Sequence, residues 1–248
     1  DFFEEICKYR AARRIWAKRL KGHYKAKNKK SMQLRFHTQT AGFSLTAQQP
    51  EINIARTGFQ ALAGVLGGTQ SLHTNSMDET LALPSEKAAE IALRTQQLIA
   101  FETGVSNVVD PLGGSYFIEN LTDKIEEKAE QYFTEIDNLG GVINAIEDGY
   151  FQREISIAAS DYQNKIDNKD RIVVGVNKYV NKNEEIDIPT LEISPEIEKK
   201  QKDKLASLKK NRSLKRVQNT LEVITETCKG NSNLMVPVIM AAKEGATL

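Results

Sequence analysis

The fold is decided by the stretch Gly67-Gly68-Thr69-Gln70-Ser71-Leu72-His73-Thr74-Asn75-Ser76-Met77-Asp78-Glu79. It follows a helix-like run and places amide, imidazole and carboxylate side chains in a short strand and in the turn after it. A strand that only filled a core would contain more Val, Ile and Leu. Polar side chains at the C-terminal end of a strand are typical of a site in an α/β barrel. The stretch therefore predicts a functional site at one end of a layered α/β fold.

Helix-like and strand-like segments alternate on both sides of this stretch. Apolar residues at helical spacing predict helices at 1–22, 50–66 and 85–103. Extended runs predict strands at 32–40, 69–76 and 105–111. Such alternation with short connections is typical of parallel β/α units. Because a closed barrel needs eight units and about 250 residues, three units predict only the C-terminal portion of a (β/α)8 TIM barrel.

The remainder of the chain is predicted to be mainly helical. Helices are expected over 115–168 with a break at Gly140-Gly141, over 196–229 as one long charged helix, and over 233–244. One more extended segment is expected at 171–179, and a polar linker at 181–195. The predicted domains are residues 1–180, the C-terminal part of the barrel, and residues 181–248, a linker and helical extension.

Composition limits the classes of function. The chain has 248 residues, 27% of them charged, and a formal net charge of +1, which gives no overall electrostatic argument for nucleic-acid binding. The basic run 18–30 is typical of a solvated helix end. No apolar run approaches the ~18 residues of a membrane span, and no signal peptide is recognisable. The two distant cysteines, Cys7 and Cys228, predict a reduced, cytoplasmic setting. The start inside a helix, without Met, indicates a piece of a longer protein.

Polar side chains stand at the end of each predicted strand. They are His37, Thr38 and Gln39 at the end of the first, His73, Thr74, Asn75 and Glu79 at or just after the end of the second, and Asp110 at the end of the third. Because the C-terminal ends of parallel strands meet at one face, we expect these groups to converge. Amides and neutral histidines hold a large polar ligand without supplying a strong base or nucleophile. That combination is typical of an enzyme whose cofactor carries the reactive chemistry.

Two other interpretations of the same residues, a metal site and simple packing of the histidines, have less support. His37 and His73, with Glu79 or Asp110, could ligate zinc, but no closely spaced His or Cys pair supports a metal site. A single histidine at such a place is usually hydrogen-bonded packing. Two histidines at corresponding strand ends, each near an amide side chain, favour contact with a ligand.

Four blocks of the sequence closely resemble the substrate-binding chain of the methylmalonyl-CoA mutase family, in the order of that family. The blocks are Arg35-Phe-His-Thr-Gln-Thr-Ala-Gly-Phe-Ser-Leu-Thr46, Gly67-Gly-Thr-Gln-Ser-Leu-His-Thr-Asn75, Asp110-Pro-Leu-Gly-Gly-Ser-Tyr116 and Val174-Gly-Val-Asn-Lys-Tyr179. The resemblance covers most of the chain and is weakest after about Val180. It implies an adenosylcobalamin-dependent isomerase whose (β/α)8 barrel threads coenzyme A along its axis.

The resemblance also implies roles for individual residues. His37 and Gln39 match positions that meet the corrin ring, and Asn75 and Glu79 match positions that bind the ribose of the adenosyl group. His73 would line the same cavity. Two further residues expected to contact the cofactor are Gly42 and Thr80. The chain departs from the family at four places, with Thr80 for Ala, Phe43 for Trp, Gln49 for Asp and Ile52 for Asn.

The implied activity is the interconversion of methylmalonyl-CoA and succinyl-CoA. The sequences of 46–50 and 92–97 also resemble the sister mutases for isobutyryl-CoA and 2-hydroxyisobutyryl-CoA. A third hypothesis is a non-catalytic barrel remnant that serves assembly.

The cobalamin motif Asp-x-His-x-x-Gly is absent from these 248 residues, as are the first barrel strands. We therefore assign no catalytic residue here and expect this chain alone to be inactive. Expected partners are an acyl-CoA, a cobalamin-binding domain or small subunit, further subunits of a homo- or hetero-oligomer and a G-protein chaperone, with no nucleic acid, membrane or bound metal ion.

Overall fold

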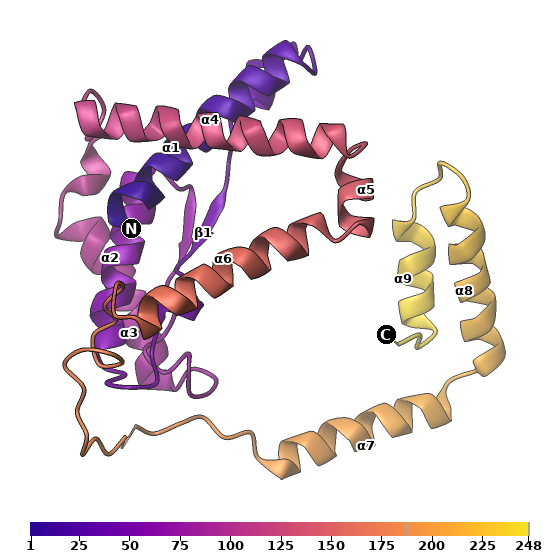
Figure 1. Cartoon of the computed structure of the whole chain (residues 1–248). Helices are drawn as coiled ribbons and strands as arrows, with labels where there is room; N and C mark the ends of the chain where they lie inside the picture. The colour runs from indigo at the N-terminus through magenta and orange to yellow at the C-terminus, as the bar shows by residue number, and fades with distance from the viewer. Residues whose placement is uncertain (187, 248) are drawn as a thin grey trace. The chain divides into compact units, whose positions relative to one another are not determined.

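The computed structural model describes residues 1–186 and 188–247. The chain divides into two compact units, Asp1–Leu191 and Glu192–Leu248. Helices make up most of the described residues (Figure 1). In the first unit they are α1 (Phe2–Gly22), α2 (Ile52–Leu66), α3 (Glu86–Phe101), α4 (Tyr116–Asn138), α5 (Val142–Glu147) and α6 (Tyr150–Asp167). In the second they are α7 (Pro195–Asn211), α8 (Leu214–Cys228) and α9 (Met235–Lys243).

The sheet of the first unit has two short strands among the described residues, β1 (His37–Gln39) and β2 (Ser71–His73). They pair in parallel, with His37 opposite Ser71 and Gln39 opposite His73. Helix α2 makes the crossover between them, as a parallel pair requires. The α/β prediction is therefore confirmed for one β–α–β unit, whereas the rest of the described chain is mainly helical. The barrel portion itself stays a prediction.

The two faces of this sheet differ in polarity. Thr38 is 5% exposed and packs against α2, where a Cβ at Gly64 would lie 3.2 Å from the Thr38 Cγ2 atom. Gly64 thus allows the helix to approach the sheet closely. Alternate residues of a strand point to opposite faces, so His37, Gln39 and His73 share the other face, and all three are exposed. The polar face of the sheet is open.

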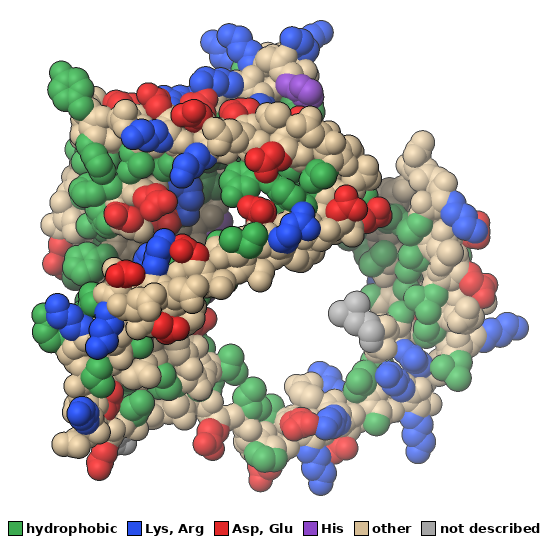
Figure 2. Space-filling view, viewed as in Figure 1, with side chains coloured by type: hydrophobic (Ala, Val, Ile, Leu, Met, Phe, Trp, Pro, Cys, Tyr) green, Lys and Arg blue, Asp and Glu red, His purple; other side chains and the backbone are tan. Residues whose placement is uncertain are grey.

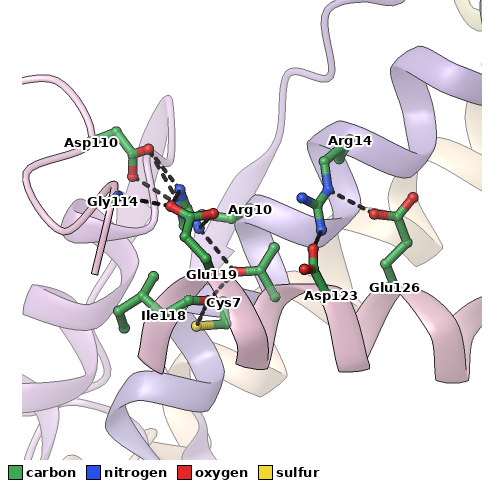
Figure 3. Close-up of polar contacts among 10 residues, drawn as sticks. Cys7, Arg10, Arg14, Asp110, Gly114, Ile118, Glu119, Asp123 and Glu126 are labelled. Carbon is green, nitrogen blue, oxygen red and sulfur yellow. Dashed lines mark hydrogen bonds and ion pairs between the residues drawn. The ribbon is translucent and has the colours of Figure 1, made fainter. Parts of the chain in front are cut away.

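Helix α4 packs along α1 through a core and a series of ion pairs. The buried core includes Ile6, Cys7 and Ile118, and the Cys7 thiol donates to the Ile118 carbonyl at 3.6 Å. Basic side chains at helical spacing on α1 form ion pairs with acidic side chains of α4 (Figure 3). The pairs are Arg10–Glu119 at 2.8 Å, Arg14–Asp123 at 2.5 Å, Arg14–Glu126 at 2.7 Å, Lys18–Glu126 at 2.5 Å and Arg19–Glu130 at 2.5 Å.

Most predicted helices are confirmed, including the N-cap at Ser85, whose hydroxyl accepts from the Ala88 amide at 3.3 Å. The predicted strand at 105–111 is wrong. Residues Val105–Asn107 form a 3₁₀ turn closed by the Asn107 amide on the Gly104 carbonyl at 3.1 Å. Asp110 then adopts a positive φ of 45° and the Gly113 amide bonds back to its carbonyl at 2.9 Å. This local turn replaces the pairing that a strand would need.

Two further predictions require correction. Residues 171–179 form a tight turn in place of an extended segment, because the Gly175 amide donates to the Lys178 carbonyl at 2.8 Å and Gly175 has a φ of 85°. The long helix expected at 196–229 is two helices. It breaks before Ser213, whose hydroxyl caps α8 by accepting from the Arg216 amide at 3.4 Å. A serine N-cap inside a charged run was the signal for this break.

The second unit contains a helical hairpin in which α8 packs on α9. Val217, Pro237 and Ala241 are buried there, and Arg212 donates to the Gly245 carbonyl at 2.7 Å. Many apolar side chains of this hairpin remain exposed (Figure 2), among them Leu214, Val223, Met235, Val236 and Met240. Within the described part of the chain, no helix combines the length and the apolar character that crossing a bilayer requires.

Candidate functional site

The open face of the sheet carries the polar groups that the sequence singled out. His37 Nδ1 lies 2.7 Å from the Ser71 hydroxyl, across the two strands. A cavity of about 350 Å³ beside β2 is lined by His37, His73 and Glu79. The structure thus brings two histidines and a carboxylate to one cavity. The expectation that the histidines stand at corresponding strand ends is wrong, because His37 begins β1 opposite Ser71, whereas His73 ends β2 opposite Gln39.

Asn75 is the best-fixed polar group of the site. Its side-chain Oδ1 accepts from Gln39 Nε2 at 3.1 Å, and its backbone N–H donates to the Thr40 hydroxyl at 2.9 Å. Asn75 is only 2% exposed, yet its Nδ2 has no hydrogen-bond partner among the described residues. Since a buried donor without a partner is costly, this atom is available to a ligand acceptor.

Gly42 lies directly beside Asn75. A Cβ at this position would lie 3.0 Å from Asn75 Nδ2 and 3.7 Å from Glu79 Oε1. Any side chain at Gly42 would therefore enter the gap between the free donor and the carboxylate. The arrangement of Gly42, Asn75 and Glu79 is a cradle for a group that carries hydroxyls, because the amide can donate and the carboxylate can accept.

Helices α2 and α3 fix the loop that bears this cradle. Thr74 donates to the Ala92 carbonyl at 2.7 Å, and Asn53 Nδ2 donates to the Met77 carbonyl at 3.0 Å. Asp78 is fully buried and accepts from the Ser85 amide at 2.9 Å through Oδ2. Asn75 and Glu79 are therefore presented from a rigid support, as a binding site requires.

Thr80 follows Glu79 in the turn and is exposed. Its side chain makes no hydrogen bond to a described residue and does not line the cavity beside β2. Of the residues that the resemblance assigned to the cofactor, His37, Gln39, Gly42, His73, Asn75 and Glu79 gather around the two strand ends, and Thr80 stands at the margin.

Asp110 does not join the histidines, and that expectation is wrong. Its carboxylate is held by Arg10, with Nε–Oδ1 at 3.0 Å and Nη2–Oδ2 at 3.1 Å (Figure 3). Arg10 also donates to Glu119 at 2.8 Å and to the Thr122 hydroxyl at 3.0 Å. Hydrogen bonds from Arg10 and from the Gly114 amide lower the pKa of Glu119 to about 2. Asp110 is thus a structural anion, held by an arginine that lies a hundred residues away in the sequence.

One residue of this region was not among the predicted site residues. Phe43, directly after Gly42, is 81% exposed and lines a second cavity of about 390 Å³ together with Gln39. A large aromatic residue in a glycine-containing turn after a polar strand end was the available signal. No cluster of three or more His, Cys, Asp or Glu side chains suited to a metal occurs among residues 1–186 and 188–247.

Comparison with known proteins supports the resemblance across the whole chain. The family model described as methylmalonyl-CoA mutase matches residues 1–248. The probable mitochondrial methylmalonyl-CoA mutase of Caenorhabditis elegans is 45% identical over all of this chain and 33% of that protein. The 2-hydroxyisobutanoyl-CoA mutase large subunit of Aquincola tertiaricarbonis is 43% identical over all of this chain and 44% of that protein.

A third relative is the methylmalonyl-CoA mutase large subunit of Porphyromonas gingivalis, which is 46% identical over 93% of this chain and 33% of that protein. The chain thus spans between a third and less than half of the length of these relatives. The match along all 248 residues, together with the polar strand ends around Asn75, shows that the chain belongs to the methylmalonyl-CoA mutase family.

Proposed function

We propose that the intact protein containing this chain is an adenosylcobalamin-dependent isomerase that interconverts methylmalonyl-CoA and succinyl-CoA. The observation that carries the proposal is the unpaired, buried Asn75 Nδ2 beside Gly42 and Glu79. A pair formed by an amide donor and a carboxylate acceptor suits a vicinal diol, and the ribose of an adenosyl group presents one.

The residues present fit the cofactor at three points. Asn75 would donate to a ribose oxygen, Glu79 would accept from the ribose hydroxyls, and Gly42 leaves the room that they need. Gln39 holds the Asn75 carbonyl oxygen, so that the free NH₂ group keeps its direction. On the same polar face, His37 and Gln39 would meet the corrin ring, and His73 would line the cavity. Bound adenosylcobalamin would supply a carbon radical through homolysis of its cobalt–carbon bond, and these side chains would hold and orient the ligand.

We also propose how the two parts of the chain contribute to the intact enzyme. Residues 1–180 are the C-terminal part of an acyl-CoA-binding (β/α)8 barrel, and residues 181–248 are a linker and helical extension toward a cobalamin-binding domain or subunit. The single parallel β–α–β unit, with its polar face open, supports this assignment. Two of the relatives are named large subunits, which supports a multi-subunit enzyme. A G-protein chaperone stays a prediction, and so does a cytoplasmic location, since several relatives are named as mitochondrial.

A second candidate keeps the chemistry and changes the acyl group. The 43% identity to a 2-hydroxyisobutanoyl-CoA mutase large subunit favours 2-hydroxyisobutyryl-CoA as an alternative substrate, and isobutyryl-CoA belongs to the same class of branched acyl group. A non-catalytic remnant would have no use for an unpaired buried amide facing a carboxylate. The open cradle therefore argues against that third reading.

The test is an assay of the intact protein with adenosylcobalamin and, if it is encoded separately, the cobalamin subunit. Methylmalonyl-CoA, isobutyryl-CoA and 2-hydroxyisobutyryl-CoA are compared as substrates by chromatography of the products. We expect turnover of methylmalonyl-CoA to succinyl-CoA. Turnover of another substrate alone would select the alternative, and failure to bind adenosylcobalamin would overturn both.

A matched pair of variants links the activity to the cradle. Asn75→Ala removes the free donor and should weaken cofactor binding about 5- to 10-fold, the usual contribution of a single hydrogen bond. Asn138→Ala removes an exposed amide at the end of α4 and should change nothing. Equal binding by both variants would show that Asn75 does not contact the cofactor.

A further inference from the structure

The Val174–Tyr179 block carries part of the family resemblance, yet none of its residues belongs to the site around Asn75. We propose that Tyr162 of α6 and Arg171, which begins the tight turn at 171–179, are positioning residues that fix the ring of Phe43 beside the cofactor site. The inference rests on the proposed function, because Phe43 would contact the bound cofactor.

Three side chains form a continuous stack. The rings of Phe43 and Tyr162 have centroids 6.1 Å apart and an interplanar angle of 73°, which is an edge-to-face contact. The Arg171 guanidinium carbon lies 4.5 Å from the centroid of the Tyr162 ring. Edge-to-face aromatic pairs and cation–π contacts are both attractive. The stack therefore links the 3₁₀ turn Gly42–Ser44 to α6 and to the turn after α6.

Phe43 is the member of this stack that adjoins the cradle in the sequence. It follows Gly42, the residue whose missing side chain leaves room beside Asn75. Gln39, Phe43, Tyr162 and Arg171 all line the cavity of about 390 Å³. Phe43 is nevertheless 81% exposed, so most of its ring is available to a ligand while one part of it contacts Tyr162.

The turn that carries Arg171 is itself fixed. Asn177 Nδ2 donates to the Arg171 carbonyl at 2.8 Å and to the Ile166 carbonyl at 3.0 Å, which ties the turn to the end of α6. Arg56 of α2 donates to the Val174 carbonyl at 2.6 Å. Because α2 and α6 both anchor the turn, Arg171 has a defined place over Tyr162.

This support has a physical purpose. An exposed phenyl ring can adopt several rotamers, and fixing one of them on binding costs conformational entropy. A ring that is already held against Tyr162 avoids part of that cost, so the affinity for a ligand that contacts the ring rises. The Arg171–Tyr179 turn would then contribute to cofactor affinity without touching the cofactor.

The experiment measures the dissociation constant of adenosylcobalamin for the intact enzyme by absorbance titration, alongside the melting temperature. Tyr162→Ala should raise the dissociation constant about three- to tenfold, which is the range of an aromatic pair. Arg171→Gln should raise it about two- to fivefold. Tyr162→Phe keeps the ring and should match the parent, since the Tyr162 hydroxyl makes no hydrogen bond to a described residue. All three should retain the parental melting temperature.

A double-mutant cycle separates positioning from general structural damage. If Tyr162 acts through Phe43, then Tyr162→Ala should cause no further loss of affinity in the Phe43→Ala background. Additive losses, or unchanged binding by Tyr162→Ala, would overturn the inference while leaving the proposed function intact. An intact parental enzyme that binds no adenosylcobalamin would overturn both.

Discussion

The loop after β2 and the turn at Asp110–Gly114 both carry polar side chains, but these side chains have opposite roles in the structure. In the loop after β2, Asn75 Nδ2 is buried without a partner among the described residues and faces the space beside Gly42. In the turn at Asp110–Gly114, Arg10 engages both Asp110 and Glu119, and the Gly114 amide donates to Glu119 at 2.8 Å. A polar group without a hydrogen-bond partner in the protein indicates ligand binding, whereas a group that is paired within the protein stabilises the fold. We call these the open and the closed polar segments.

The strongest test of this contrast is Glu79→Gln in the intact enzyme. The substitution replaces a charged acceptor with a neutral amide at the cradle, so we expect adenosylcobalamin affinity to fall about 10- to 100-fold. Glu79 is exposed and its carboxylate makes no hydrogen bond to a described residue, so the melting temperature should stay unchanged. Absorbance titration and thermal unfolding measure the two quantities. A loss of stability without a loss of affinity would place Glu79 with the structural anions.

The opposite pattern is expected for Arg10→Leu. Arg10 is 12% exposed in its side chain and serves two carboxylates and a hydroxyl. Its removal should destabilise the packing of α4 on α1 by about 1–2 kcal/mol, after allowance for the solvent exposure of the carboxylates. Hydrogen exchange over 108–122 in the intact protein should accelerate about 5- to 30-fold, with unchanged cofactor affinity.

Arg94→Leu is the matched control for that experiment. Arg94 also pairs with a carboxylate, Glu90, at 3.2 Å, but 64% of its side chain is exposed. An exposed pair of this kind contributes little, about 0.3–0.5 kcal/mol. Similar acceleration of exchange by both variants would contradict the structural role assigned to Arg10.

A smaller effect is expected from Gly42→Ala. The added Cβ would lie 3.0 Å from Asn75 Nδ2, so the amide must shift by a few tenths of an ångström and part of the ligand space is lost. We expect a three- to tenfold loss of cofactor affinity, roughly one hydrogen bond, with little change in stability. Gly58→Ala is the control, because its Cβ would meet only Thr95 Cγ2 at 4.0 Å. Unchanged affinity in Gly42→Ala would show that the ligand does not use this gap.

The comparison also shows which features of the fold and of the candidate site could be predicted from the sequence. Helical spacing and the Ser85 cap were sufficient for most helices, because those signals are local. The alternation of elements predicted the parallel pairing of the two strands, but it did not give the register, in which His73 lies opposite Gln39 and His37 opposite Ser71. Asp110 was misassigned because its partner, Arg10, is 100 residues away and a helical arginine carries no local mark of its target.

Strands were the other weak point, for a related reason. The run 105–111 contains β-branched residues, but a strand requires a neighbour to pair with, whereas the Gly104–Asn107 and Asp110–Gly113 turns close through local hydrogen bonds. The turn at 171–179 likewise depends on the Asn177 side chain bonding back to Arg171. Side chains that substitute for backbone partners are hard to recognise from apolar periodicity alone.

The last and smallest effect that we predict is a pH dependence confined to the closed segment. Arg10 and the Gly114 amide lower the pKa of Glu119 from 4.5 to about 2. A carboxylate with a lowered pKa in the folded state stabilises it fully above the pKa of the unfolded chain, and this stabilisation is lost as pH falls from about 4.5 toward 2. The urea midpoint of the parent should therefore decrease over this range more steeply than that of Arg10→Leu. Parallel curves would mean that Arg10 does not hold Glu119 ionised, and the distinction between closed and open polar segments would then rest on Asn75 alone.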